Sequence, residues 1–488
     1  MSDAPSPVHS AAGEPALDGP TIAHATGGRL LLEGHRPVRG ACVDSRRLRP
    51  GELFVALPGE QTDGHRFLEP AVRAGAAALL VSRDLEEDRL SELRAMAAEA
   101  GVSVIRVEDG LRALQALAAE WRSRFSPLVV GVTGSVAKTS TKEAVAETLT
   151  ERWRVLRSEG NENNEIGLPL TLLRLGPEHE VAVLEMGMYV PGEIALLARL
   201  ARPRVGVVTA VRATHLSRAG SLDAIERGKG ELVEALPLDG TAVLNADDAR
   251  VRRMAARTRA RSLGYGFDAG ADVRAEAVES LGEAGMRFVL HLPGGERLPA
   301  TTPSLGRHSV HNALAAAAVG LAVGLDAPTI VAGIARGARA PHRSTLLPAG
   351  EWRILDDSYN AAPDSMAAAL DLLASLPGRH VAVLGEMREL GEMAAEAHRE
   401  VGRRAAATTD LLVVVGAEAA GIAEGARAES GPPLGVLEVP DREAALALLA
   451  ERLRPGDTVL VKASRGVQLD LLVEQLAALG SGSGAPRA

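Results

Sequence analysis

Near the start of the chain, short apolar runs alternate with more polar stretches of helical periodicity. The apolar runs lie at Leu53–Leu57, Ala77–Val81 and Val102–Val107, and each has the length of a buried strand. This alternation predicts a small α/β domain over residues 25–125. Residues 1–24 are polar and rich in alanine and proline, so we expect them to be disordered.

The middle of the chain continues the alternation with more uniformly apolar strands. One strand is predicted to end at Thr133, and a loop of small residues then leads into an amphipathic helix from about residue 139 to 151. Three further buried strands are predicted at Val181–Leu184, Val205–Thr209 and Ala242–Leu244. Because strands that alternate with helices form parallel sheets, residues 126–338 are predicted to form one domain, with a hairpin insertion near 268–302.

The same alternation restarts near residue 339. Strands are predicted at Arg353–Leu355, Val381–Leu384, Leu411–Val415 and Thr458–Val461, with helices between them. Residues 339–480 are therefore predicted to form a Rossmann-like domain, followed by a disordered tail at 481–488. The predicted fold class is α/β with three domains.

The composition narrows the classes of function and the compartment. The formal net charge of -9 gives no electrostatic reason to expect nucleic acid as a partner. Cys42 is the single cysteine, which excludes an intrachain disulfide and fits a reducing compartment. The most apolar stretch, Ala313–Leu325, is too short to cross a bilayer, and the N-terminus lacks the features of a signal peptide. We therefore expect a cytoplasmic protein without membrane insertion.

Lysine and asparagine are scarce in this chain and are therefore informative. The lysines are Lys138, Lys142, Lys229 and Lys462, while arginine supplies nearly all the other positive charge. The asparagines are Asn161, Asn163, Asn164, Asn245, Asn312 and Asn360. Biased codon usage explains part of this scarcity. A chain that uses arginine as its general cation nevertheless keeps lysine where a compact, reactive amine is needed.

A candidate phosphate-binding loop follows the strand that ends at Thr133. It consists of Gly134, Ser135, Val136, Ala137, Lys138, Thr139 and Ser140. In this context backbone N–H groups and a helix N-terminus face an anion, Lys138 adds a mobile charge, and the Thr139 hydroxyl can bind Mg²⁺. The strict motif fails, because Ala137 precedes the lysine, so an ordinary strand–turn–helix corner is the alternative. The scarcity of lysine favours phosphate binding and makes residues 126–338 a P-loop-like ATPase domain.

Three further residues are candidates for the active site because of their side chains and their positions in the sequence. Glu185 ends a predicted parallel strand, where such sheets bind ligands, although a lone glutamate is more often a helix cap or an ion-pair partner. His215 follows another strand, and a lone histidine is more often structural. Lys229 lies in a stretch whose other cations are arginines, although a solvated helix face would be its ordinary interpretation.

Taken in order, these and other segments resemble the Mur ligase family over about residues 40 to 475. The resemblance includes Asp44–Arg46, Gly51–Ala56, Thr133–Ser140, Asn161–Pro169, Glu185, His215, Lys229, Asn245–Asp248, Gly306–Asn312, Asp356–Asn360, Pro363–Met366, Leu384–Gly391 and Lys462–Gly466. No single segment is decisive, but their order and spacing together are highly specific.

The resemblance implies an ATP-dependent ligase that joins a carboxylate to an amine through an acyl phosphate. The implied substrates are UDP-N-acetylmuramoyl-tripeptide and D-alanyl-D-alanine, and the implied cofactors are ATP and Mg²⁺. The implied catalytic residues are Lys138, Glu185, His215 and Lys229. One magnesium ion is expected near Thr139 and Glu185, and a second near His215 and Lys229, with the lysine present as its carbamate.

The resemblance also implies the remaining contacts. Asn312 is expected at the adenine, Arg343 at the γ-phosphate and Asp357 at the ribose. The expected substrate contacts are Ser45 and Arg46 in a UDP-sugar-binding N-terminal domain, and Asn161, Asn164, Asn360, Lys462, Ser464 and Arg465 elsewhere. The chain is expected to be a monomer.

The chain departs from the family pattern at several positions. Val136 and Ala137 replace the usual Asn–Gly before the lysine, and Ala210, Ser309, Ala362 and Ala463 replace other common residues. If position 137 requires a positive φ, alanine costs about 1–2 kcal/mol there. Val136 and Ala137 support one alternative, a non-catalytic nucleotide-binding relative. Two alternatives within the same chemistry are a related ligase that adds another amino acid and a polyglutamate synthetase, and the resemblance at residues 356–366 argues against both. Whether the third residue of the tripeptide is lysine or diaminopimelate stays open.

Overall fold

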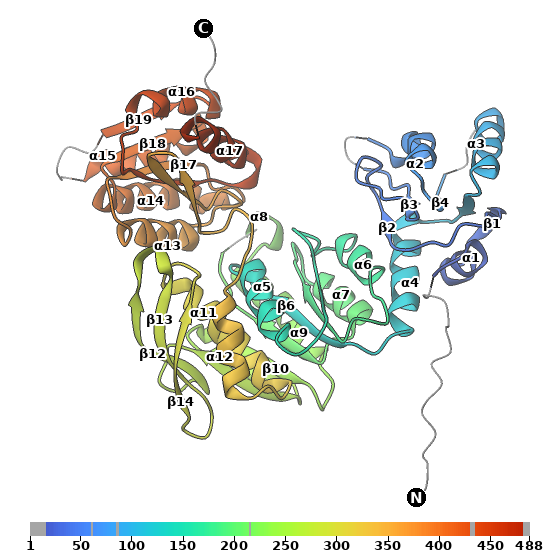
Figure 1. The fold of residues 1–488 in the computed structure, drawn as a ribbon, viewed down its shortest axis with the longest axis horizontal. Coiled ribbons are helices and arrows are strands. Elements are labelled where there is room, and N and C mark those ends of the chain that lie inside the picture. The colour runs from blue at the N-terminus through green and yellow to red at the C-terminus, as the bar shows by residue number, and fades with distance from the viewer. Residues whose placement is uncertain (1–15, 60–61, 84–86, 214–215, 430–434, 482–488) are drawn as a thin grey trace, which may run out of the picture. The chain divides into compact units, whose positions relative to one another are not determined.

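The computed structural model describes residues 16–59, 62–83, 87–213, 216–429 and 435–481. These residues form three sheets with helices packed against them (Figure 1). The predicted α/β class with three domains is confirmed. Two compact units can be separated, residues 1–127 with 165–180 and residues 128–164 with 181–488.

The first unit contains a five-stranded sheet in the order β1-β5-β4-β3-β2. Its strands are β1 (Arg29–Leu32), β2 (Ala41–Cys42), β3 (Leu53–Val55), β4 (Ala78–Val81) and β5 (Ser103–Arg106), and its helices are α1 (Gly19–Thr26), α2 (Leu68–Arg73), α3 (Glu87–Glu99), α4 (Gly110–Ser123) and α6 (Gly167–Leu172). All strand pairs are parallel except β1 with β5.

Helix α1 corrects the prediction that residues 1–24 are disordered. Asp18 caps it through a bond from the Thr21 N–H, Gly27 ends it at a φ of 64°, and Ile22 is fully buried. These are ordinary helix start and stop signals, which an interpretation based on the alanine and proline content overlooked. The ordered N-terminal unit therefore begins before residue 25.

The segment 165–180 groups with the first compact unit. The sequence assigned these residues to the domain at 126–338, but they pack within the first unit. There the indole Nε1 of Trp121 donates to the Leu175 carbonyl at 2.9 Å, and the Gln115 side chain donates to the Glu165 carbonyl at 3.1 Å. Helix α6 thus lies in the sequence between two strands of the nine-stranded sheet but packs in the first unit.

The second unit begins with a nine-stranded sheet in the order β14-β13-β12-β11-β10-β9-β6-β8-β7. Its strands are β6 (Leu128–Thr133), β7 (Val155–Arg157), β8 (Val181–Glu185), β9 (Val205–Val208), β10 (Thr241–Asn245), β11 (Arg261–Gly266), β12 (Val273–Ser280), β13 (Met286–His291) and β14 (Arg297–Thr302). Strands β12 to β14 pair antiparallel with one another and form the insertion predicted near 268–302, while the remaining pairs are parallel.

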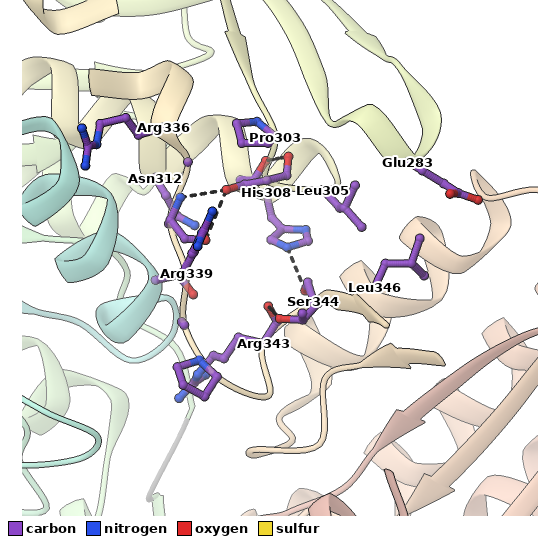
Figure 2. A pocket seen from close by; sticks show the side chains of 18 residues that line it. Glu283, Pro303, Leu305, His308, Asn312, Arg336, Arg339, Arg343, Ser344 and Leu346 are labelled. Atoms are coloured by element: carbon purple, nitrogen blue, oxygen red, sulfur yellow. Dashed lines mark hydrogen bonds between the residues drawn. The ribbon is translucent and has the colours of Figure 1, made fainter. Parts of the chain in front are cut away.

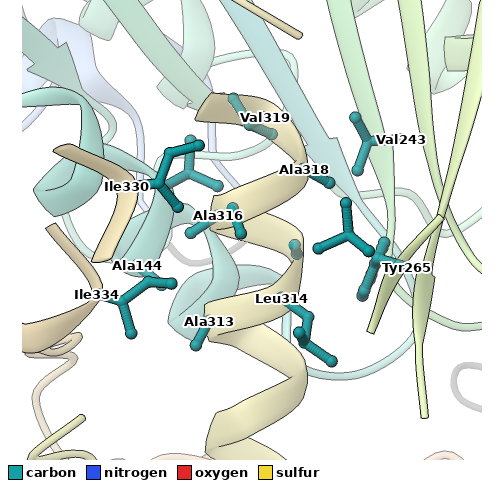
Figure 3. Packing of buried hydrophobic residues seen from close by; sticks show 14 of the residues in the cluster. Ala144, Val243, Tyr265, Ala313, Leu314, Ala316, Ala318, Val319, Ile330 and Ile334 are labelled. Carbon is teal, nitrogen blue, oxygen red and sulfur yellow. The ribbon is translucent and has the colours of Figure 1, made fainter. Parts of the chain in front are cut away.

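Alternate residues of these strands face two different hydrophobic clusters. Helices α5 (Lys138–Leu149), α11 (Arg307–Ala322) and α12 (Ala327–Arg336) contribute to one cluster, and α9 (Leu222–Glu234) contributes to the other. Figure 3 shows the alanine-rich α11 with Val243 and Tyr265 of the sheet on one side and Ile330 of α12 on the other. Small side chains let these elements approach closely, so the position of α5 is fixed by a dense core.

The second unit ends with a six-stranded sheet in the order β15-β16-β20-β17-β18-β19. Its strands are β15 (Thr345–Ala349), β16 (Trp352–Asp356), β17 (His380–Gly385), β18 (Leu411–Val415), β19 (Gly435–Val439) and β20 (Thr458–Lys462), and its helices are α13 (Pro363–Ala374), α14 (Ala394–Thr408), α15 (Ala420–Ala428), α16 (Arg442–Arg452) and α17 (Leu469–Gly480). All pairs are parallel except β15 with β16. Helices α13, α14 and α15 pack in one cluster, and α16 and α17 in another, so both faces of the sheet are covered.

Within the described part of the chain, no helix is both long and apolar enough to cross a membrane.

Candidate active site at the phosphate loop

The loop between β6 and α5 is held in place by the strand beside it. Gly134 has a φ of 151°, and a Cβ atom there would lie 1.8 Å from the Thr209 Oγ1. That hydroxyl donates to the Val136 carbonyl at 2.6 Å, and the Ser135 N–H donates to the Ala210 carbonyl at 2.8 Å. Only glycine fits at position 134, and the end of β9 fixes the path of the loop.

Ala137 adopts the left-handed conformation that the sequence raised as a concern. Its φ is 63°, and α5 begins at the next residue. No side chain caps this helix N-terminus. The first N–H groups of a helix carry partial positive charge and lack helical acceptors, so this end of α5 fits an anion.

Lys138 and Glu185 form the charged centre of the site. The half-buried Lys138 extends from the first turn of α5, and its Nζ lies 3.4 Å from the Ser135 carbonyl. Burial lowers the pKa of Lys138, the Glu185 carboxylate opposes this shift, and the Arg343 guanidinium adds to it. An ammonium between an acid and a second cation is suited to a ligand that carries several negative charges.

Glu185 has one satisfied and one unsatisfied carboxylate oxygen. It ends β8 with 2% of its surface exposed, and its Oε1 accepts a bond of 2.7 Å from the Asn163 amide. Its Oε2 is buried and has no hydrogen-bond donor among the described residues. A buried carboxylate oxygen needs a donor or a cation, so this atom fits a magnesium ion. No group of three His, Cys, Asp or Glu side chains that could hold a metal occurs in the described ranges.

Lys229 lies in α9 with 3% of its surface exposed. Burial, together with the positive charge of Lys138, holds its pKa well below the ordinary value. A larger fraction of its amine is therefore neutral near pH 7, and a neutral amine is the form that reacts with CO₂. His215, the other residue predicted to bind the second metal ion, lies outside the described residues.

Arg343 approaches the phosphate loop from the segment that leads into β15. Its Nη2 lies 3.5 Å from the Thr139 Oγ1, and its guanidinium stacks 4.4 Å from the centre of the Tyr359 ring. Its neighbours His342 and Ser344 have φ values of 58° and 47°, which non-glycine residues rarely adopt. This strained backbone directs the arginine toward the loop.

Two adjacent carboxylates at the end of β16 hold the strained backbone around Arg343 in place. The His342 Nδ1 lies 2.8 Å from the Asp356 Oδ2, and the Ser344 N–H donates to the Asp357 Oδ1 at 3.0 Å. Arg343 is therefore held from both sides by the C-terminal sheet.

Two adjoining cavities lie beside the loop. One, of about 280 Å³, is lined by the loop, Asn245, Tyr265 and Asp357. The other, of about 470 Å³, is shown in Figure 2, and both are lined by His308, Asn312, Arg343 and Ser344. Burial lowers the pKa of His308, whose Nε2 lies 3.2 Å from the Ser344 Oγ.

Asn312 is oriented by its neighbour on α5. The Thr141 hydroxyl donates to its Oδ1 at 3.0 Å, which leaves the amide N–H groups for a ligand in the cavities. An amide held in this way can recognise the edge of a base.

Lys462 and Asp357, which were predicted to contact ligands, contact each other. The Lys462 Nζ donates to the Asp357 Oδ2 at 2.5 Å and to the Asn360 carbonyl at 2.8 Å, and the lysine is 2% exposed. The Asn360 side chain is bonded to the next backbone N–H, from Ala361, at 2.9 Å. The buried pair thus holds together the two ends of strands that border the cavities.

A third cavity, of about 290 Å³, lies between the phosphate loop and the C-terminal sheet. Its far wall contains Asn360, Arg388, Ser464 and Arg465, of which only Arg388 was not predicted. The backbone N–H of Arg388 donates to the Ser464 Oγ at 2.9 Å, and Arg465 pairs with Asp470 at 2.6 Å. Two arginines facing the loop across a cavity suit a second anionic ligand.

The other predicted substrate residues make local contacts. Ser45 and Arg46 belong to the first unit, where Arg46 is 87% exposed and binds Asp44 at 2.7 Å. Asn161 is exposed, and its carbonyl accepts a bond of 2.7 Å from the Asn163 N–H. Asn164 is half-buried beside them. Sequence reasoning missed Asn163 as the partner of Glu185, although the scarcity of asparagine pointed to it.

Comparison with known proteins decides the family. Three family models match this chain: "Mur ligase family, catalytic domain" over residues 37–122, "Mur ligase middle domain" over 132–320, and "Mur ligase, glutamate ligase domain" over 342–465. This chain belongs to the Mur ligase family.

Full-length relatives share the same organisation. The UDP-N-acetylmuramoyl-tripeptide--D-alanyl-D-alanine ligase of Synechocystis is 38% identical over 462 residues, covering 90% of this Mur ligase and 92% of that protein. The protein of the same name from Escherichia coli is 37% identical over 442 residues, covering 89% and 92%.

Solved structures agree with the sequence relatives. MurF from Acinetobacter baumannii superposes with a TM-score of 0.83 at 29% identity, covering 95% of this chain and 99% of that one. The MurF ligase of Thermotoga maritima in complex with ADP gives 0.77 at 30% identity, covering 92% and 99%.

Replacing Ala137 by glycine should stabilise this Mur ligase. Glycine adopts the observed φ of 63° without strain, so the free energy of unfolding should rise by about 1 kcal/mol, as measured by denaturant unfolding. Ala144→Gly, inside α5, is the matched control and should lower stability by about 1 kcal/mol. Destabilisation by Ala137→Gly would show that the loop is not strained at this position.

Replacing Lys462 by methionine should destabilise the fold. The change leaves Asp357 buried without its partner, so the free energy of unfolding should fall by about 3–5 kcal/mol. Arg427→Met removes an ion pair with Glu438 in which both side chains are exposed, at 51% and 42%, so it should change the free energy by less than about 0.5 kcal/mol. Equal stability of the two variants would mean that the buried pair does not hold the strand ends together.

Proposed function

We propose that this Mur ligase joins D-alanyl-D-alanine to UDP-N-acetylmuramoyl-tripeptide, with conversion of ATP to ADP and phosphate. The observation that carries the proposal is the convergence of an anion-binding helix end, Lys138 and the unsatisfied Glu185 oxygen at one point. The names of the relatives that match along nearly their whole length support the choice of substrates. The chain is therefore an ADP-forming amide ligase of cell-wall precursor synthesis.

ATP fits the cavities that adjoin the phosphate loop. The triphosphate lies along residues 134–140, where the N–H groups of α5 and the Lys138 ammonium neutralise its charge. Asn312 provides amide groups for the base, and Asp357 lines the cavity where the ribose is expected. The relative from Thermotoga maritima that was solved with ADP supports nucleotide binding in this fold.

Magnesium would be held at the side of the loop where Glu185 lies. The Glu185 Oε2 and the Thr139 hydroxyl are the proposed ligands of one ion, which would neutralise charge on the phosphates. The proposed ligands of a second ion are His215 and Lys229. Because carbamylation converts an amine to a carboxylate on a long side chain, a carbamylated Lys229 would supply the oxygen ligands that a hard cation prefers.

The reaction then proceeds in two steps. The terminal carboxylate of the tripeptide attacks the γ-phosphorus, which forms an acyl phosphate and releases ADP. The amine of D-alanyl-D-alanine attacks the acyl carbon, which forms the amide and releases phosphate. Lys138 and Arg343 stabilise the charge on the transferring phosphoryl group, and catalysis rests on positioning and electrostatics.

The acceptor dipeptide fits the cavity between the loop and the C-terminal sheet. Arg388 and Arg465 line its far wall and can bind the free carboxylate, while the phosphate loop lines its near wall. A dipeptide held in this orientation directs its amine toward the acyl phosphate. The reaction is proposed to take place in the cytoplasm, and the monomeric state stays a prediction.

The proposed function is tested by measuring ADP release from the purified protein. ADP should form at a high rate only when ATP, Mg²⁺, UDP-N-acetylmuramoyl-tripeptide and D-alanyl-D-alanine are all present, with one amide bond per ADP. Single amino acids offered in place of the dipeptide distinguish a related ligase. Nucleotide binding without turnover under every combination would contradict the proposal and favour a non-catalytic relative.

Substitutions of Lys229 should reveal whether its carbamate acts. Lys229→Arg keeps a positive charge but cannot form a carbamate, so we expect it to lower kcat as severely as Lys229→Ala, by about 10–100-fold. The alanine variant leaves space in which formate or acetate can provide oxygen ligands, and these anions should partly restore kcat. No rescue is expected for the arginine variant, which is its matched control.

Removal of CO₂ gives a second measurement on the unaltered enzyme. Its activity should fall in CO₂-free buffer at mildly alkaline pH and return when bicarbonate is added. A fully active Lys229→Arg variant would rule out the carbamate, because arginine supplies only charge.

A further inference from the structure

Lys142 is a buried lysine that the proposed reaction does not use. It lies in α5 one turn after Lys138, and its side chain is completely inaccessible to solvent. The Lys142 Nζ donates to the Ser158 carbonyl at 2.5 Å and pairs with the Glu143 Oε1 at 2.5 Å. It is one of only four lysines in a chain whose general cation is arginine, so a buried amine at this position is unusual for the chain.

Ser158 connects this lysine to the strand that carries Glu185. Ser158 follows β7, the edge strand of the central sheet, and is 1% exposed. Its N–H donates to the Val183 carbonyl at 3.2 Å, and its hydroxyl accepts a bond of 3.1 Å from the Glu185 N–H. Lys142, Ser158 and Glu185 therefore form a continuous path of two hydrogen bonds from α5 to the end of β8.

The path links α5 to β8, whose relative position must be fixed if their side chains are to bind the same ligand. Helix α5 carries Lys138 and Thr139, whereas β8 carries the unsatisfied Glu185 oxygen. Helix α5 packs on β8, and β6 pairs with β8 next to the loop, so the strand end after β7 adds a polar link to this packing. The ammonium of Lys142 fixes that strand end to the helix, and the Ser158 hydroxyl fixes it to the backbone of Glu185.

The alternative is that Lys142 has a purely structural role as the ion-pair partner of Glu143. Glu143, however, does not need Lys142 to neutralise its charge. Glu143 also pairs with Arg157, at 2.9 Å, so its charge is neutralised without Lys142. Burying an ammonium is costly, and a well-packed apolar residue is often as stabilising as a buried ion pair. The bond to Ser158 is what an apolar replacement cannot reproduce.

We propose that Lys142 is a positioning residue that, through Ser158, sets the Glu185 carboxylate against the phosphate-binding end of α5 and so couples Mg²⁺ to nucleotide binding. The inference rests on the proposed function, because it assumes that a nucleotide and Mg²⁺ bind at this loop. Residues that orient metal ligands commonly change metal affinity by about 10–100-fold when they are replaced.

The test is the dissociation constant of ADP, measured by calorimetry with Mg²⁺ and with a chelator in its place. The ratio of the two constants gives the enhancement by Mg²⁺ and needs no turnover. Lys142→Met should lower this enhancement by at least about tenfold relative to the unaltered protein. Its ADP affinity without Mg²⁺ should stay within about twofold, since Lys138 and the end of α5 are unchanged.

Two further variants separate positioning from stability. Ser158→Ala removes the bond to the Glu185 N–H and should reduce the enhancement as Lys142→Met does, and the double variant should be no worse than the more affected single variant. Thr148→Val is the matched control, since Thr148 lies in the same helix, is 1% exposed and has no hydroxyl partner among the described residues. It should leave the enhancement unchanged whatever its melting temperature.

The outcomes are distinct. If Lys142→Met only lowers the melting temperature and keeps the enhancement, the lysine is structural and the inference is wrong. If Lys142→Met does not fold, an unchanged enhancement in Ser158→Ala would overturn the inference, and a reduced one would support it. If the unaltered protein binds ADP without any effect of Mg²⁺, the proposed function itself fails at this site.

Discussion

The left-handed turn at Ala137 is the constraint on which the active site depends. It ends the loop after β6 and starts α5, so that the helix N-terminus, Lys138 and Thr139 face the carboxyl ends of the parallel strands. The turn is strained for alanine, and it persists because Thr209 and Ala210 hold the preceding residues. The dense core around α11 fixes the helix itself. Substrate-binding geometry is thus set by packing that lies well behind the loop.

Around this turn, charge is arranged to receive an anion and a cation together. Lys138 and Arg343 present positive charge, and burial keeps the pKa of Lys138 below its ordinary value. Glu185 presents one buried oxygen without a donor among the described residues. Such groups are already oriented before substrate arrives, which is how phosphoryl transfer is accelerated without covalent participation by the protein. The strained backbone on both sides of Arg343 likewise orients its side chain before substrate arrives.

Hydrophobic periodicity predicted most of the fold. Uniformly apolar strands such as β6, β8, β9, β17 and β18 were predicted. The edge strands β7, β15 and β19 were missed, and so was the interior strand β11, because their patterns are less buried. Helix α1 was missed because its capping residues were read as part of a disordered segment. The placement of residues 165–180 depends on long-range packing against α4, which local periodicity does not record.

The scarcity of lysine predicted part of the site, and the resemblance predicted the rest. Lys138 and Lys229 lie close enough for the charge of one to affect the pKa of the other, and Asn312 lines the nucleotide cavities. The pairing of Lys462 with Asp357 was not predictable, because residue type indicates a charged role but not the partner. The hydroxyl of Ser158 and the amide of Asn163 are common groups, and only the fold shows that both contact Glu185.

The mechanism requires this site to activate a carboxylate by transferring a phosphoryl group to it. The most direct measurement uses tripeptide substrate whose terminal carboxylate is labelled with heavy oxygen, followed by mass analysis of the products. We expect one labelled oxygen atom per turnover in inorganic phosphate, because the amine attack breaks the acyl C–O bond and the leaving phosphate keeps the bridging oxygen. Unlabelled phosphate would contradict the account, because the carboxylate would then have been activated by another route.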